Sequence, residues 1–181
     1  MAELLLVRHC ASTGQAPEAS LTPDGASDAA ALAERLIELG CDAVVSSPYR
    51  RAIDTIAPFA TCRGLDIAID ERLAERRLEG VPSPHWLDHV RRSFDNESYR
   101  APGGETLAEA RARGLAALAG IASWRHIRPA VVTHGNLLSS LLRSVDPHWG
   151  FEQWRALGNP ELFSIEIAAE RLVAFERVVW R

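Results

Sequence analysis

Arg8 and His9, two residues that can bind anions or carry out nucleophilic chemistry, directly follow the apolar run at residues 3–7. Such a short run predicts a buried β-strand. Open α/β sheets bind their ligands at the carboxyl ends of their strands. An imidazole placed there can act as a nucleophile or carry a proton near neutral pH. An isolated Arg-His pair would more often be an ordinary surface loop, so the rest of the chain has to decide.

Two more predicted strands end in residues of the same kind. The strand at 42–46 is followed by Ser47 and then by Arg51, and the strand at 130–133 is followed by His134. If these strands are neighbours, two imidazoles and two guanidiniums meet at one edge of the sheet. Four potential cations repel one another unless an anion lies among them. Phosphate fits best, because guanidinium groups match its oxygens and helix amino termini supply further N–H donors.

Capping and periodicity signals predict the elements that position these residues. Thr22-Pro23 should open a helix that Gly40 ends, and Ser47-Pro48 should open another of about ten residues toward Pro58. A capping box at Thr106 and Glu109 begins a long helix. The remaining elements are a strand at 65–69, a short helix near 84–95, a helix at 137–142, and closing strands at 162–167 and 171–179.

This alternation of strands and helices predicts an α/β fold with a doubly wound, mostly parallel central sheet and helices on both faces. We expect residues 1–181 to form a single domain, since no linker, repeat or low-complexity segment interrupts them.

Composition limits the function further. The net charge of -4 gives no overall basic surface for nucleic acid, so an anion site has to come from a local cluster of arginines. The three cysteines fit neither a disulfide framework nor a metal site, and we expect a reduced, cytoplasmic protein without metal or cofactor. No signal peptide or membrane span is evident.

Further short motifs occur in a fixed order along the chain. They are Arg8-His9, then Leu21-Thr22-Pro23-Asp24-Gly25, residues 46–55, Leu73-Ala74-Glu75, Pro102-Gly103-Gly104-Glu105-Thr106, Val132-Thr133-His134-Gly135-Asn136, and Asn159 before the closing strands. Together they resemble the histidine phosphatase superfamily, whose best-known members are the cofactor-dependent phosphoglycerate mutases. Each motif is weak alone, but their order is specific and spans nearly the whole chain.

The resemblance implies a role for each of five residues. His9 is the nucleophile that attacks phosphorus and becomes a phosphohistidine. Arg8, Arg51 and His134 hold the phosphoryl oxygens and offset the charge that develops on them. Glu75 donates a proton to the leaving oxygen and later activates water. The implied activity is hydrolysis of a small phosphorylated metabolite, with inorganic phosphate as product.

Other residues are candidates for binding the rest of the substrate. These are Ser12, Gln15, Gly135, Asn136 and Arg100. Residues 76–103 lie where the family builds its substrate lid. Five arginines, Arg76, Arg77, Arg91, Arg92 and Arg100, lie in or near this segment. We expect most of them to be solvated and one or two to bind a second anionic group of the substrate.

Cys10 departs from the pattern, because the family usually has Gly or Ala after the nucleophile. It is interpreted as a tightly packed small residue. The alternative is an oxidation-sensitive thiol, which would require exposure and a lowered pKa. A cysteine phosphatase is excluded, since that chemistry needs Arg six positions after Cys and the corresponding residues are Ala16, Ser47 and Ala68.

Two alternatives to a phosphatase remain open. One is a phosphoglycerate mutase, although only residues 76–101 separate Glu75 from the Pro102-Gly103-Gly104 loop, whereas mutases of this family carry longer insertions there. The other is a non-catalytic module that binds a phosphorylated ligand. The physiological substrate stays open, and a homodimer is possible.

Overall fold

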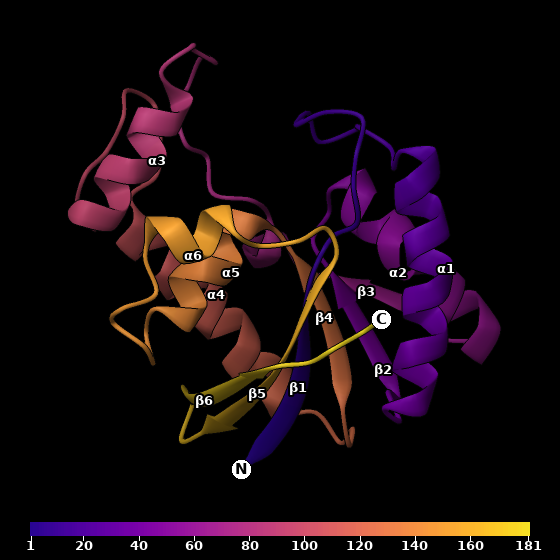
Figure 1. The fold of residues 1–181 in the computed structure, drawn as a ribbon. Coiled ribbons are helices and arrows are strands. Elements are labelled where there is room, and N and C mark those ends of the chain that lie inside the picture. The colour runs from indigo at the N-terminus through magenta and orange to yellow at the C-terminus, as the bar shows by residue number, and fades with distance from the viewer.

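A computed structural model describes residues 1–181 and contains one mixed six-stranded sheet (Figure 1). The strand order is β3-β2-β4-β1-β5-β6, and the first four of these strands are parallel. At one edge β5 pairs antiparallel with β1, and β6 pairs antiparallel with β5. The strands are β1 (Ala2–Arg8), β2 (Ala43–Ser46), β3 (Ile67–Ile69), β4 (Pro129–Thr133), β5 (Glu161–Ala168) and β6 (Arg171–Arg177).

Helices cover both faces of the sheet, so the predicted fold class is confirmed (Figure 1). The helices α1 and α2 lie on one side, and α4, α5 and α6 lie on the other, while α3 stands away from the sheet. Their bounds are α1 (Pro23–Glu38), α2 (Arg50–Arg63), α3 (Trp86–Asp95), α4 (Leu107–Ala122), α5 (Gly135–Leu142) and α6 (Phe151–Arg155), with a 3₁₀ turn, η1, at Glu71–Leu73. None of these helices has the length and apolarity needed to cross a bilayer.

The central strand β1 serves two cores at once. Side chains of a strand alternate between faces, so Leu4 and Leu6 pack into the core under α4 and α5. Leu5 and Val7 pack into the core under α1 and α2. All four are at most 1% exposed. This burial on both faces explains why the first strand reads as an uninterrupted apolar run, and it fixes the position at which Arg8 and His9 emerge.

The second helix differs from its predicted bounds. It begins at Arg50 with Tyr49 as the N-cap, and it runs through Pro58 to Arg63. Ser47 does not cap it, because the Ser47 hydroxyl contacts a histidine ring. The proline does not end it, since the buried face of the helix continues to Phe59 and the left-handed Gly64 provides the stop. Arg51 still lies in the first turn, as expected.

The remaining predicted elements are confirmed with small changes at their ends. The strands expected at 65–69 and 171–179 are shorter, spanning Ile67–Ile69 and Arg171–Arg177. The capping box of α4 is present: the Glu109 N–H donates to Thr106 Oγ1 at 3.1 Å, and the Thr106 N–H donates to Glu109 Oε2 at 2.9 Å.

Gly25, in the first turn of α1, lies against the loop that follows β1. A Cβ atom at this position would meet the Ala11 carbonyl oxygen at 2.1 Å. We expect Gly25→Ala to lower the free energy of unfolding by about 1–3 kcal/mol, because backbone has to move to admit the methyl group. Denaturant unfolding measures this change.

Gly120→Ala is the matched control. Its added Cβ would lie 3.6 Å from the nearest atom, Arg72 Nη2, which is ordinary contact. This substitution should leave stability unchanged or raise it, because alanine suits a helix better than glycine. Equal effects of the two substitutions would contradict the close approach of α1 to Ala11.

Candidate active site

The three polar strand ends meet because β4 lies between β1 and β2, with all three parallel. The pairing continues one residue beyond the strands. The His9 N–H donates to the Thr133 carbonyl at 3.0 Å, and the Ser47 N–H donates to the Val132 carbonyl at 2.9 Å. The ring centroids of His9 and His134 are 5.0 Å apart. The structure therefore brings together the residues that the sequence placed at separate strand ends.

Two hydrogen bonds define the state of the His9 ring. Its Nδ1 lies 2.6 Å from the Cys10 carbonyl oxygen, which can only accept, so Nδ1 carries the proton. Its Nε2 accepts from Arg51 Nε at 3.1 Å and therefore holds a lone pair. The Asn159 side-chain amide donates to the His9 carbonyl at 2.8 Å and holds the backbone. A neutral imidazole with a lone pair on Nε2 has the form that a nucleophile needs.

Both imidazoles are held neutral. Burial lowers the pKa of His9 from 6.5 to about 3, and the positive charges of Arg51 and Arg8 add to this effect against the favourable bond to Cys10. Burial, followed by His9 and Arg51, lowers the pKa of His134 well below its ordinary value. Near neutral pH, therefore, neither ring contributes a positive charge in the ligand-free protein.

His134 is enclosed completely. Its Nε2 lies 2.7 Å from Ser47 Oγ, and the Tyr49 ring packs edge-on against it with centroids 4.9 Å apart. Its Nδ1 is buried and has no hydrogen-bond partner. His134, whose ring neighbours that of His9, thus has one ring nitrogen, Nδ1, that makes no hydrogen bond within the protein.

The two predicted anion-binding arginines approach from opposite segments of the chain. Arg8 Nη1 donates to the carbonyls of Leu157 and Gly158 at 2.8 and 3.2 Å, while its buried Nε has no partner. Arg51 is 1% exposed, and its Nη1 donates to the carbonyls of Gln15 and Ala16. Burial lowers the pKa of both arginines, and the negative charge of Glu75 acts in the opposite direction.

Glu75 is fixed by backbone donors rather than by an arginine. Its Oε1 accepts from the N–H groups of Arg76 and Leu137 at 2.8 and 3.1 Å, and its Oε2 accepts from Asn136 at 3.1 Å. The last two donors belong to the first turn of α5, where a carboxylate is favoured by the helix dipole. This arrangement holds the carboxylate beside His134, the N-cap of α5.

Three of the predicted substrate contacts are placed near this group. Gly135 packs against the Arg8 guanidinium, since a Cβ atom on it would lie 3.2 Å from Arg8 Nε. Asn136 has a buried side-chain oxygen without a partner. Gln15 has an exposed side chain, and it is its carbonyl that reaches Arg51.

Ser12 and Arg100 are already engaged in local contacts. The Ser12 hydroxyl donates to the Gly14 carbonyl at 3.0 Å. Arg100 pairs with Glu109 at 2.6 Å and donates to the Gly104 carbonyl at 3.2 Å, next to the start of α4.

Cys10 is a packing residue, as the first of its two interpretations held. It is 0% exposed and belongs to the core beneath α1 and α2. Burial raises the pKa of its thiol to about 12, opposite to the shift that a redox-sensitive cysteine requires. The Cys10 N–H donates to Thr55 Oγ1 at 2.9 Å, and this hydrogen bond links the segment that carries His9 to α2.

Sequence reasoning missed several residues that shape the site. Ser47 and Asn159 were part of recognised motifs, but nothing in the pattern said that they contact His134 and His9. Arg76 belongs to a group of five arginines of which most were expected to be solvated, but it is only 3% exposed. It follows Glu75 directly, and the alternation of the extended segment could have suggested burial. No group of three or more His, Cys, Asp and Glu side chains is placed to hold a metal ion.

Comparisons with known proteins agree with this fold. The chain is 31% identical over 162 residues to the "Probable phosphoglycerate mutase GpmB" of Salmonella paratyphi B, covering 80% of this chain and 75% of that protein. A Bacillus stearothermophilus protein, YhfR, superposes with a TM-score of 0.78 at 25% identity, covering 97% of this chain and 96% of that one. The mycobacterial glucosyl-3-phosphoglycerate phosphatase Rv2419c, in complex with inorganic phosphate, superposes with a TM-score of 0.79 at 23% identity and covers 99% and 97% of the two chains.

The fold and the comparisons thus define an α/β enzyme of phosphate-ester chemistry. The model of the histidine phosphatase superfamily (branch 1) matches residues 4–177, and the chain belongs to that family.

The protonation of the two imidazoles gives a direct prediction. In the ligand-free protein the ring signals of His9 should not titrate between pH 8 and about 5, because its pKa lies near 3. NMR of ¹³C-labelled histidine, assigned with His9→Ala, measures this. A His9 midpoint near that of an unfolded histidine would contradict the assignment.

The same shift predicts lower stability in acid. The unfolded chain binds the His9 proton as pH falls below 6.5, whereas the folded protein resists it until about 3. Stability contributed by the neutral ring is therefore lost progressively as pH falls through this window.

Proposed function

We propose that this protein is a metal-independent phosphomonoester hydrolase that acts on a small phosphorylated metabolite through a phosphohistidine intermediate. The observation that carries the proposal is the His9 ring. Its proton is held on Nδ1 by the Cys10 carbonyl, and its Nε2 lone pair lies beside the buried Arg51 guanidinium. This arrangement combines a nucleophile with a group that matches the phosphoryl oxygens.

In the first step, His9 Nε2 forms a bond to phosphorus as the bond from phosphorus to the substrate oxygen breaks. Arg51 releases Nε2 and turns its N–H donors to the phosphoryl oxygens, together with Arg8 and His134. Glu75 protonates the leaving oxygen, which would otherwise depart as a poor alkoxide leaving group. The products of this step are the free alcohol and phosphohistidine.

In the second step, water attacks phosphorus and the bond between phosphorus and Nε2 breaks. Glu75 now takes the proton from water. His9 and Glu75 have therefore returned to their starting states when phosphate departs. We expect the backbone N–H of Gly135, the first residue of α5, to bind a phosphoryl oxygen. Ser12, Gln15 and Asn136 are the further candidates for substrate contacts.

A phosphoglycerate mutase is the second candidate, and the named relative at 31% identity favours it. A mutase has to protect its phosphohistidine from water. The short segment between Glu75 and the Pro102-Gly103-Gly104 loop provides only one helix, α3, for that purpose. We therefore place hydrolysis first.

We also propose a reducing, cytoplasmic setting and a single folding domain. All three cysteines are free, and two of them, Cys10 and Cys41, are buried. Both large hydrophobic clusters share the strands of the one sheet, so neither would be complete without the other.

The nucleophile can be tested by substitution and by trapping. His9→Ala should lower phosphatase activity by at least about 10³-fold, since a covalent nucleophile has no substitute in the site. The bond between phosphorus and nitrogen in phosphohistidine is labile in acid and stable in base, so a rapid alkaline quench with ³²P-labelled substrate should recover label on the wild-type chain and none on His9→Ala. His85→Ala, which alters an exposed side chain, is the matched control. Full activity in His9→Ala would rule out this mechanism.

The product separates hydrolysis from mutase activity. With 3-phosphoglycerate, the wild-type protein should release inorganic phosphate without forming 2-phosphoglycerate, because little of the chain covers the phosphohistidine. Phosphorus NMR follows both products at once. Accumulation of 2-phosphoglycerate ahead of phosphate would establish the mutase instead.

The role of Glu75 predicts a dependence on the leaving group. Glu75→Gln should lower kcat for an alkyl phosphate by about 10²–10⁴-fold, the usual contribution of a general acid. The loss should be much smaller for phosphorylation of His9 by p-nitrophenyl phosphate, whose leaving group needs no proton. Burst kinetics measure that step separately. Equal losses for the two substrates would show that Glu75 only positions α5.

A further inference from the structure

Glu161, the first residue of β5, is a buried carboxylate that the proposed mechanism does not use. The residue is 9% exposed, and both of its carboxylate oxygens have partners. Its Oε2 accepts from the Gly158 N–H at 2.8 Å, and its Oε1 lies 3.3 Å from Arg177 Nε. The register between β1 and β5 places Glu161 directly opposite Arg8. Glu161 is therefore close enough to influence this arginine, either through its charge or through the loop before β5.

The peptide unit between Leu157 and Gly158 connects the two residues. Arg8 Nη1 donates to the Leu157 carbonyl at 2.8 Å and to the Gly158 carbonyl at 3.2 Å. The Leu157 carbonyl and the Gly158 N–H belong to one planar peptide, in which they point in opposite directions. The hydrogen bond from the Gly158 N–H to Glu161 therefore fixes the direction of the carbonyl that holds Arg8.

Anchoring one nitrogen of Arg8 leaves the rest of its guanidinium for a ligand. The buried Nε has no hydrogen-bond partner. A Cβ atom on Gly135 would lie 3.2 Å from Nε and 3.3 Å from Nη2, so this edge of the guanidinium lies against the first residue of α5. Helix amino termini also favour anions. The guanidinium is thus fixed to backbone through Nη1, while Nε and Nη2 lie beside a helix start, as a preorganised phosphate site requires.

Charge contributes less than this hydrogen bond does. Burial lowers the pKa of Arg8, and the carboxylates of Glu75 and Glu161 act in the opposite direction, with Glu161 the smallest of the three influences. Glu75 also has to carry a proton to act as a general acid, and its charge is then lost. Glu161 has no part in the proposed proton transfers. Its hydrogen bond to Gly158 is available in both steps of the reaction.

We infer that Glu161 is a positioning residue for phosphate binding, which holds the Arg8 guanidinium in its receiving orientation through the peptide unit between Leu157 and Gly158. The inference rests on the proposed function, which assigns Arg8 to the phosphoryl group. Glycine has unusual conformational freedom, so without this hydrogen bond the peptide before Gly158 can turn its carbonyl away from Arg8.

Calorimetric titration with inorganic phosphate tests this role without requiring turnover. Glu161→Ala should raise the Kd for phosphate about tenfold, because the carbonyl that anchors Arg8 is released. Glu161→Gln keeps an oxygen that accepts from Gly158, and its Kd should stay within about threefold of the wild-type value. Glu166→Ala is the matched control, since it removes an exposed carboxylate from the same strand and should leave the Kd unchanged. Equal losses in Glu161→Ala and Glu161→Gln would overturn the inference.

A double-mutant cycle separates positioning from general support of the fold. In the Arg8→Ala background, Glu161→Ala should change the Kd for phosphate by less than about twofold, because no guanidinium remains to be positioned. A purely structural role would weaken binding by the same factor with and without Arg8, and that result would overturn the inference. Thermal melting verifies that each variant is folded. If Glu161→Ala is not, Glu161→Met, which fills the space but lacks the oxygen acceptor, takes its place in the cycle.

Binding and turnover distinguish this inference from the proposed function. If the wild-type protein binds phosphate but hydrolyses no phosphomonoester, the proposed function fails, and the cycle between Glu161 and Arg8 still decides the inference. If the wild-type protein hydrolyses phosphomonoesters and Glu161→Ala binds phosphate as tightly, the function stands and the inference is overturned. Failure of the wild-type protein to bind phosphate would overturn the inference as well.

Discussion

Buried positive charge is the constraint on which this site depends. Arg51 and Arg76 are almost completely enclosed at the carboxyl edge of the sheet, and Arg8 keeps a buried N–H without a partner. Neutral imidazoles are the arrangement that the surrounding guanidiniums favour, because one more cation would add to the repulsion. Burial is the main reason why His9 stays unprotonated and therefore nucleophilic, and the charges of Arg51 and Arg8 add to it. Those same charges make the site attractive to phosphate. The state of the nucleophile and the affinity for the ligand thus share part of their cause.

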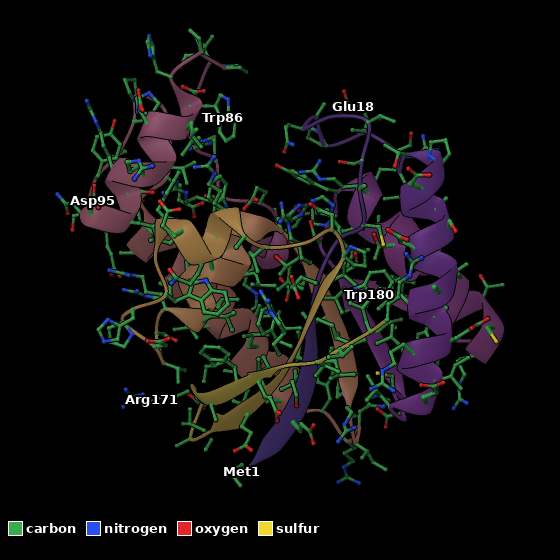
Figure 2. The ribbon with its side chains drawn as sticks, in the orientation of Figure 1. Met1, Glu18, Trp86, Asp95, Arg171 and Trp180 are labelled. Carbon is green, nitrogen blue, oxygen red and sulfur yellow. The ribbon has the colours of Figure 1, made fainter.

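The sheet makes this concentration of charge possible. Parallel pairing on both sides of β4 aligns His9, Ser47 and His134 within one register, and backbone hydrogen bonds extend that register past the strand ends. The hydrophobic cores on the two faces of β1 stabilise the fold, and this stabilisation offsets the cost of burying polar groups that have no partner. Figure 2 shows Glu18, on the loop after β1, and Trp86, at the start of α3, at the end of the molecule to which these strands point. Those two segments lie at the same end of the molecule as the polar strand ends.

Sequence alone was sufficient for most of the elements and for the residues at strand ends, because apolar runs and helix caps are local signals, but it did not predict α6 or the turn η1. It failed where a side chain had a distant partner. Ser47 looked like a helix cap, but its hydroxyl is used by His134, which lies far away in sequence. Gln15 looked like a side-chain ligand, but only its carbonyl reaches Arg51. Most arginines of the segment around Arg76 were expected to be solvated because charged residues usually are, and the burial of Arg76 is an exception that only the alternation of the extended segment could have suggested.

The state of His9 also bears on whether the site is catalytic or only binds phosphate. A module built solely to hold an anion would gain from a charged imidazolium, whose two N–H groups would both donate. Here the Nδ1–H donates a hydrogen bond to the Cys10 carbonyl, and Nε2 presents a lone pair. A lone pair repels phosphate oxygens, so this ring weakens simple binding. It becomes favourable only when the lone pair forms a bond to phosphorus, and that difference between ground state and transition state is what catalysis requires.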